Sequence, residues 1–251
     1  MPLKKVNVQA ELRGAMATIE LELTYTNPSN ESPLECTYVF PLEKTTILSK
    51  FEAVIGDKVV KTKVTDKETA KENYDDAMAS GNAAVMAERT SKKEETMTVK
   101  LGNLLPGQDA TLKATIVSQL EVIAGHYAFF LPVAFYPDYK KHGVKAQGAF
   151  VYDFAYTVSI FNEKEITNLS LPANSSVIDK DDKRTRMTIQ CTEPSRTIDL
   201  YYRTGNMMVP QALYAVSPDG DKVACSVSLV PTFDPVHPQD FYEEVADEKP
   251  S

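Results

Sequence analysis

The sequence predicts an all-β protein: an antiparallel β-sandwich with one short helix, packed on a second antiparallel β unit. Apolar and polar residues alternate along most of the chain, turn residues separate the alternating segments, and only one segment has helical spacing. The alternation is clearest at Ala17, Ile19, Leu21, Leu23 and Tyr25. Period two is the pattern of a strand with one buried face, and its recurrence between turns is typical of antiparallel sandwiches.

Further strands are expected along nearly the whole length of the chain. Their alternating positions lie at 97–101, 112–116, 152–160, 187–189, 198–202 and 225–229. Turn residues separate them at 27–30, 56–57, 106–107 and 217–221.

The helix is expected at about residues 66–80. Its apolar positions Ala70, Tyr74, Ala77 and Met78 repeat at helical spacing. Thr65 followed by Glu68 forms a capping box at the start, and Gly81 supplies a left-handed stop. Because an isolated helix of this length is marginal in water, we expect it to dock on a sheet through Tyr74 and Met78.

Changes in the pattern suggest a first domain at 1–124, a second β unit at 125–234 and an acidic linker or tail at 235–251. Residues 136–149 lose their periodicity, as an exposed connection does. The tail carries five acidic residues among prolines and has little to bury, so it is expected to be loosely held.

Charge and hydropathy exclude several classes of function. The 251 residues carry a net charge of −8, which argues against a nucleic-acid partner. The apolar runs are far shorter than the roughly 18 residues of a membrane-spanning helix, so no membrane insertion is expected. The N-terminus turns polar by Gln9 instead of forming the apolar core of a secretory signal, which predicts a cytoplasmic location.

The cysteines are predicted to be free thiols. Cys36, Cys191 and Cys225 are odd in number, lack metal-type spacing and lie in strand-like segments. Small buried hydrophobes in a reducing compartment have this distribution.

Metal ligands and cofactor motifs are not expected. His126, His142 and His237 stand far from one another and from the cysteines. Residues 179–182 include three aspartates, but the glycine and the final glutamate of an EF-hand loop are missing, so a charged hairpin turn is favoured.

Catalysis is not expected either. The sequence has no nucleophile elbow and no phosphate-binding glycine loop. Cys191 or Cys225 with His126 or His142 would be the candidates for a distant nucleophile and base, but such a pair is nearly always coincidence. Residues for partner binding are not identifiable from the sequence alone.

Four ordered landmarks carry a resemblance to a known family. They are Phe40-Pro41, the run 51–58, the segment 67–74 and the turn Gly102-Asn103-Leu104-Leu105-Pro106-Gly107. Together they resemble the VIT domain, the vault protein and inter-alpha-trypsin module. A weaker likeness to the intracellular von Willebrand factor A domain-containing 5 type continues through Leu131-Pro132 and 198–202. The resemblance implies a scaffold or interaction module without assigned chemistry.

The resemblance also implies a partner. VIT modules usually precede a von Willebrand A domain, whose Asp-x-Ser-x-Ser metal loop does not occur in these 251 residues. Residues 223–231 and the acidic tail resemble the approach to that domain, so we expect either that such a domain follows or that this half stands alone in a larger assembly. One alternative is the regulatory half of an enzyme such as the vault-associated poly(ADP-ribose) polymerase. Another is a ligand- or carbohydrate-binding sandwich, which the absence of tryptophan disfavours.

Overall fold

The computed structural model describes residues 3–41, 46–61, 67–82, 84–89, 96–132, 152–191, 197–205 and 207–230. The chain divides into two compact units, Met1–Gly205 and Asn206–Ser251. Among the described residues, the first unit contains three β-sheets and a helix, and the second contains a two-stranded hairpin. The domain limits predicted near residues 124 and 234 stay predictions.

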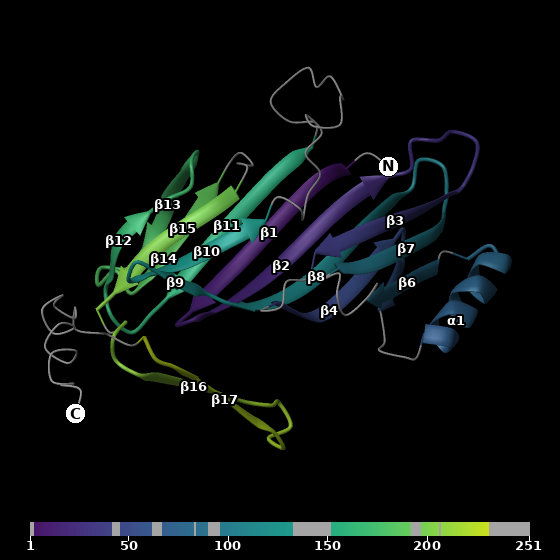
Figure 1. Ribbon diagram of the computed structural model, residues 1–251. Coiled ribbons are helices and arrows are strands. Elements are labelled where there is room, and N and C mark those ends of the chain that lie inside the picture. Colours follow the sequence, from purple (N-terminus) through teal and green to yellow (C-terminus); the bar gives the residue numbers. More distant parts are fainter. Residues whose placement is uncertain are drawn as a thin grey trace, which may run out of the picture. The chain divides into compact units, whose positions relative to one another are not determined.

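An eight-stranded sheet is the largest element of the first unit (Figure 1), with the strand order β13-β14-β11-β1-β2-β8-β4-β5. The bounds are β1 Leu3–Arg13, β2 Met16–Thr26, β4 Thr46–Ile55, β5 Lys58–Lys61, β8 Asp109–Gln119, β11 Asp153–Phe161, β13 Ser175–Lys180 and β14 Arg186–Cys191. Segments far apart in the sequence therefore form one continuous layer.

Alternation decides which face of this sheet is buried, as predicted. In β2, the side chains of Ile19, Leu21 and Leu23 are at most 3% exposed, while Glu20 and Glu22 lie on the opposite face. The neighbouring strands β1 and β8 bury the same face. Full burial of one aliphatic side chain is worth about 1.5–3 kcal/mol, so this face supplies much of the driving force for folding.

One strand pair departs from the predicted antiparallel pattern. Strands β1 and β11 are parallel, with Val8 opposite Tyr156 and Leu12 opposite Ile160. Parallel neighbours need a long connection, which the chain between Arg13 and Asp153 provides. The pair joins β11, β14 and β13 to the strands of the first half of the chain. The sequence did not predict this pairing, because alternation indicates which face of a strand is buried but not which strand lies beside it. The all-β class with one short helix is confirmed.

Two smaller sheets complete the described part of the first unit. The four-stranded sheet has the order β12-β15-β10-β9, with bounds Ile166–Ser170, Thr197–Thr204, His126–Pro132 and Glu121–Ile123. It buries Tyr127 against Tyr202, with ring centroids 5.5 Å apart. The three-stranded sheet has the order β3-β7-β6, with bounds Leu34–Pro41, Thr96–Leu104 and Ala84–Arg89. It buries Val99 and Leu101.

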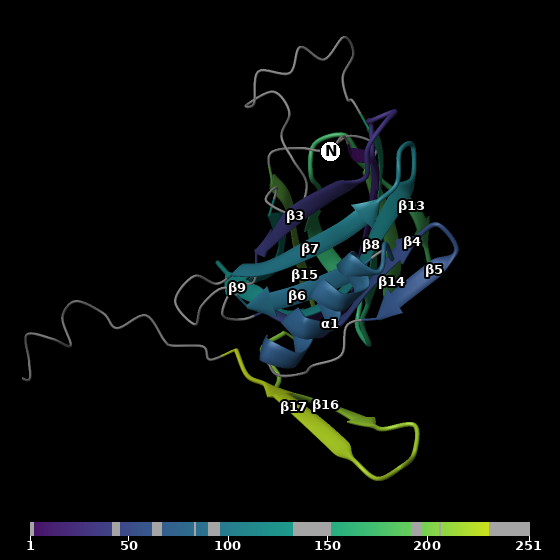
Figure 2. The same ribbon diagram turned by 90° about the vertical axis from the view of Figure 1, so that its right-hand side faces the viewer.

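Helix α1 spans Lys67–Ala79, close to the predicted range, and packs on β6 (Figure 2). The predicted stop is confirmed: Gly81 has a φ of 72°, its N–H donates to Met78 O, and the N–H of Asn82 donates to Ala77 O. This pair of bonds satisfies two of the helix's last carbonyls, as in a Schellman motif. The capping residue predicted at Thr65 lies outside the described residues.

The second unit contains the hairpin of β16 (Gln211–Val216) and β17 (Val223–Ser228). Its turn is closed by Ser217, whose N–H donates to Lys222 O and whose carbonyl accepts from Gly220 N–H. In the part of the chain that the structure describes, neither strand pairs with any other. No helix among the described residues is long and apolar enough to cross a membrane.

Candidate interaction surfaces

The landmark turn of the sequence holds the helix in place. Gly102 on β7 faces α1, and a Cβ there would clash with Met78 Sδ and lie 2.8 Å from Tyr74 Oη. The next residue, Asn103, has a φ of 54°, and its side-chain amide donates to Met78 O (3.1 Å) and Asn82 O (2.9 Å). Gly102 leaves room for the helix, and Asn103 binds the C-terminal end of the helix. This part of the motif therefore stabilises the fold.

The rest of the landmark turn is joined to the loop that follows β2. Asn27 is 1% exposed, and its backbone N–H donates to Gln108 O (3.0 Å) while its carbonyl accepts from Gly107 N–H (3.1 Å). Its side-chain amide also donates to Leu104 O (2.8 Å). The side chain of Gln108 accepts a hydrogen bond from Leu105 N–H (3.0 Å). These bonds leave the polar groups of a buried asparagine satisfied, which is the condition for burying them.

The buried side of α1 carries one polar link to β3. Tyr74 is 7% exposed and packs with Ala84 and Met86, with Ala77 and Met78 beside them. Its hydroxyl donates to Glu35 Oε1 at 2.8 Å. Burial, followed by the hydrogen bond to Glu35, raises the pKa of Tyr74, so the phenol stays protonated and keeps donating. The predicted docking through Tyr74 and Met78 is confirmed.

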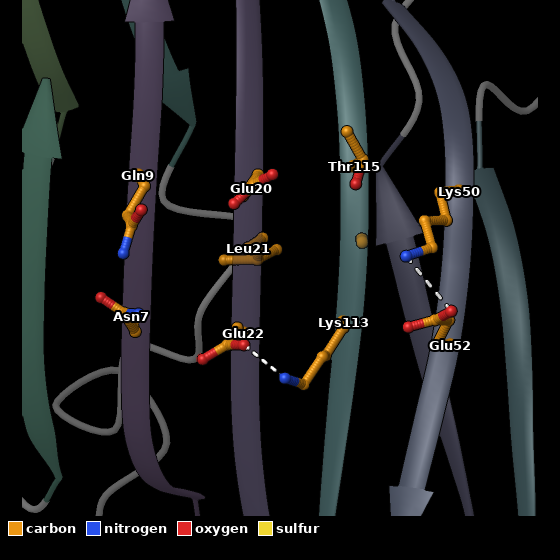
Figure 3. A pocket seen from close by; sticks show the side chains of 10 residues that line it. Asn7, Gln9, Glu20, Leu21, Glu22, Lys50, Glu52, Lys113 and Thr115 are labelled. Atoms are coloured by element: carbon orange, nitrogen blue, oxygen red, sulfur yellow. Dashed lines mark ion pairs between the residues drawn. The ribbon is translucent and has the colours of Figure 1, made fainter. Parts of the chain in front are cut away.

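The outer face of the eight-stranded sheet forms an open depression of about 270 Å³ (Figure 3). Register places two polar rows side by side across β1, β2, β8 and β4. One row is Asn7, Glu22, Lys113 and Glu52, and the other is Gln9, Glu20, Thr115 and Lys50.

Charges in this depression are largely paired with one another. Lys113 Nζ lies 2.7 Å from Glu22 Oε1, and Lys50 Nζ lies 3.2 Å from Glu52 Oε1. The hydrogen bond from Lys113 lowers the pKa of Glu22 below its ordinary value, and the same bond raises the pKa of Lys113. Binding pockets for small molecules are mostly apolar, so this face has the character of a solvated sheet surface.

Among the described residues, the large apolar side chains with the highest exposed fractions lie on the hairpin. Cross-strand pairing places six apolar residues on one face, and we call this set the hairpin apolar face: Ala212, Tyr214, Val216, Val223, Cys225 and Val227. Tyr214 is 78% exposed, Val227 70% and Val223 69%. The opposite face mixes apolar and polar residues, since Leu213 pairs with Ser226 and Gln211 with Ser228. A two-stranded ribbon is marginally stable by itself, and none of the described residues covers the apolar face of this one.

The three cysteines are free, as predicted, but they differ in burial. Cys191 is buried and Cys36 is half-buried, and burial raises the pKa of both thiols. The expectation that Cys225 would be buried is wrong, because β17 pairs only with β16 and nothing described covers its apolar face.

The aspartate segment is a hairpin turn between β13 and β14, as predicted. Asp181 accepts hydrogen bonds through its carboxylate from Thr185 Oγ1 (2.6 Å) and Arg186 N–H (2.8 Å), and these bonds lower its pKa. His126 begins β10, with its Nδ1 2.9 Å from Ala124 O. His142 and His237 lie outside the described residues. Among the described residues, no group of three potential ligands could hold a metal ion.

The hairpin apolar face was not identified from the sequence. Period-two alternation at 225–229 was the available signal, and it indicated a half-buried strand. Alternation reports which residues share a face, but it does not report whether another layer covers that face. The polar rows could not be predicted for a related reason, since they depend on the register between strands that are distant in sequence, such as the pairing of Glu22 with Lys113.

Comparison with known proteins gives relatives for both the first half and the whole chain. The model of the vault protein inter-alpha-trypsin domain matches residues 3–116. The von Willebrand factor A domain-containing protein 5A of Homo sapiens is 30% identical over 169 residues, 64% of this chain and 21% of that protein. A von Willebrand factor A domain-containing protein of Dictyostelium discoideum is 27% identical over 254 residues, 96% of this chain and 26% of that protein.

Two other proteins match with lower coverage of the relative or lower identity. The protein mono-ADP-ribosyltransferase PARP4 of Homo sapiens is 29% identical over 137 residues, 55% of this chain and 8% of that protein. A solved M1 zinc metallopeptidase from Deinococcus radiodurans is 12% identical, with 96% of this chain and 51% of that chain covered. Its TM-score of 0.40 is too low to support an argument.

The chain thus spans about a quarter or less of the length of these curated relatives. The landmarks at 51–58, 67–74 and 102–107 all fall inside the matched range, and two of them meet at the junction of α1 with β7. Residues 3–116 of the chain therefore match the vault protein inter-alpha-trypsin domain family, and the other residues lie outside that match.

Proposed function

We propose that the chain is a non-catalytic protein-interaction module that mounts a following von Willebrand factor A domain or fastens its protein into a larger assembly. The carrying observation is the use of the landmark residues. Gly102 and Asn103 fix α1, and the N–H of Gly107 donates to Asn27 O. The landmark residues thus make structural contacts that hold the domain together. Function must then be sought at a site that this domain presents or supports.

The relatives support the choice of partner. Two proteins of Dictyostelium discoideum match 96% and 92% of this chain, and both are named for a von Willebrand factor A domain. This chain covers only 26% and 24% of them. In those proteins a region like this one is therefore joined to a much longer polypeptide.

The experiment tests whether the 251-residue chain binds the part of the gene product that follows it. The residues after 251 would be produced separately and titrated with the 251-residue chain by calorimetry. The mounting role expects the two parts to associate, and it expects the melting temperature of the later part to rise on association. Separate parts that neither bind nor change each other's melting temperature would overturn the mounting role.

A second candidate is the regulatory half of a multidomain enzyme. The match to PARP4 favours it, since that protein is named as a mono-ADP-ribosyltransferase and shares 137 aligned residues with this chain. The sequence of the complete gene would distinguish the regulatory role from the mounting role. A transferase domain after residue 251 would support the regulatory role, whereas an Asp-x-Ser-x-Ser loop after a buried strand would support the mounting role.

A further inference from the structure

The hairpin apolar face consists of apolar side chains only. Its three cross-strand pairs are Ala212 with Val227, Tyr214 with Cys225, and Val216 with Val223. None of the six side chains carries a charge, and all six are exposed. Exposed apolar residues normally occur singly on a surface, so a complete apolar ladder on one face indicates a contact.

The size of this face limits what can cover it. Six residues along each of two strands span roughly 20 Å by 10 Å, a footprint of about 200 Å². A stable complex between separate proteins needs about 800 Å² on each partner. The face alone is therefore too small to hold a second copy of the chain or an independent protein. A cover tethered to the same polypeptide avoids this limit, because tethering raises its effective concentration to about the millimolar range.

We propose that the hairpin apolar face is the docking surface for a von Willebrand factor A domain carried on the same polypeptide. This inference rests on the proposed function and places the contact with the mounted domain on β16 and β17. Relatives matched over 92–96% of this chain continue well beyond the matched region and bear that domain in their names. The docked domain would supply an apolar surface as the missing second layer of the ribbon.

Cys225 provides a direct probe, because its thiol lies in the central pair of the face and is exposed. The rate of maleimide labelling at Cys225 would be measured in the 251-residue chain and in the complete gene product, with buried Cys191 as internal reference. We expect labelling to be at least about tenfold slower in the complete product, because covered amides and thiols react only after local opening. Equal rates in the two proteins would overturn the proposal.

Two neighbouring residues on opposite faces make a matched pair of variants. Val227→Asp adds a charge to the hairpin apolar face, and Ser226→Asp adds the same charge to the opposite face of the same strand. In the complete product, Val227→Asp should restore fast labelling of Cys225, and Ser226→Asp should leave it slow. The reverse result would place the contact on the other face and overturn the proposal. Both residues are exposed in the 251-residue chain, so both variants should keep its melting temperature.

The outcomes separate this inference from the proposed function. If the two parts associate but Cys225 is labelled equally fast in both proteins, mounting stands and the hairpin is not its surface. If the parts do not associate, the mounting role itself fails. Slow labelling of Cys225 in the 251-residue chain that becomes faster on dilution would show that a second copy covers the face, and it would also overturn the inference.

Discussion

The junction of α1 with β7 and the β16–β17 hairpin are both apolar surfaces on β-strands, but they differ in how completely they are covered. At the junction, Tyr74 is 7% exposed, and Gly102 leaves room for the helix. On the hairpin, Tyr214 is 78% exposed and faces no described layer. The same residue type serves as an internal anchor in one place and as an open contact surface in the other.

This contrast locates stability and function in different regions. Landmark residues within 3–116 contact the buried side of α1, so substitutions at the junction should lower the stability of the fold. The hairpin contributes little buried area to the chain itself, so substitutions there should act on association. Substitutions at the junction should therefore cost the most stability, and those on the hairpin the least.

Tyr74→Ala should lower the free energy of unfolding by about 3–5 kcal/mol, because it removes a buried aromatic ring and leaves a cavity. Chemical denaturation followed by circular dichroism measures the loss. Lys71→Ala, on the exposed side of the same helix, should change stability by no more than about 0.5 kcal/mol. Equal, small effects at both positions would mean that α1 is not anchored and could itself bind a partner.

Gly102→Ala should cost about 1–3 kcal/mol, because the added methyl group overpacks the contact with Met78 and Tyr74. Part of this cost should be recovered in a background of Met78→Ala, which removes the side chain that a Cβ would strike. A double-mutant cycle on the free energy of unfolding gives the coupling. Strict additivity would show that Gly102 is needed for some reason other than room for the helix.

Glu22→Gln should cost at most about 1 kcal/mol near pH 7, since the pair with Lys113 is 37–44% exposed and is screened by solvent. The folded-state pKa of Glu22 is lowered, so the pair stabilises the fold above the ordinary glutamate range and loses this effect as pH falls through the folded value. Melting temperatures of both proteins between pH 7 and pH 3 should therefore converge at the acidic end. A constant difference would exclude titration of Glu22 as the cause.

Val227→Thr should change the stability of the 251-residue chain by no more than about 0.5 kcal/mol, because the side chain is 70% exposed. Hydrogen exchange should find the amides of 211–228 labelled early, whereas those of β2 and β11 exchange slowly. A loss of more than about 2 kcal/mol would mean that the chain covers this face itself, and the contrast with the junction would disappear.

Local patterns were enough to predict the elements. The spacing of Tyr74 and Met78 and the glycine at 81 predicted a helix that the structure places at Lys67–Ala79. Alternation in residues 17–25 predicted the buried face of β2, and the aspartates before Thr185 predicted a turn. These signals succeed because each depends on residues within about two turns of a helix or one face of a strand.

Contacts between distant segments were decided only in three dimensions. Nothing in the sequence placed β11 parallel to β1, Lys113 beside Glu22, or the amide of Asn103 on the carbonyl of Met78. Strand pairing depends on long-range competition between many similar alternating segments, and a period of two is the same in all of them. The sequence by itself therefore determined the class, the helix and the resemblance of residues 3–116 to a known domain. Among the described residues, the tertiary structure decided which apolar faces are buried and showed that the one on β16 and β17 is exposed.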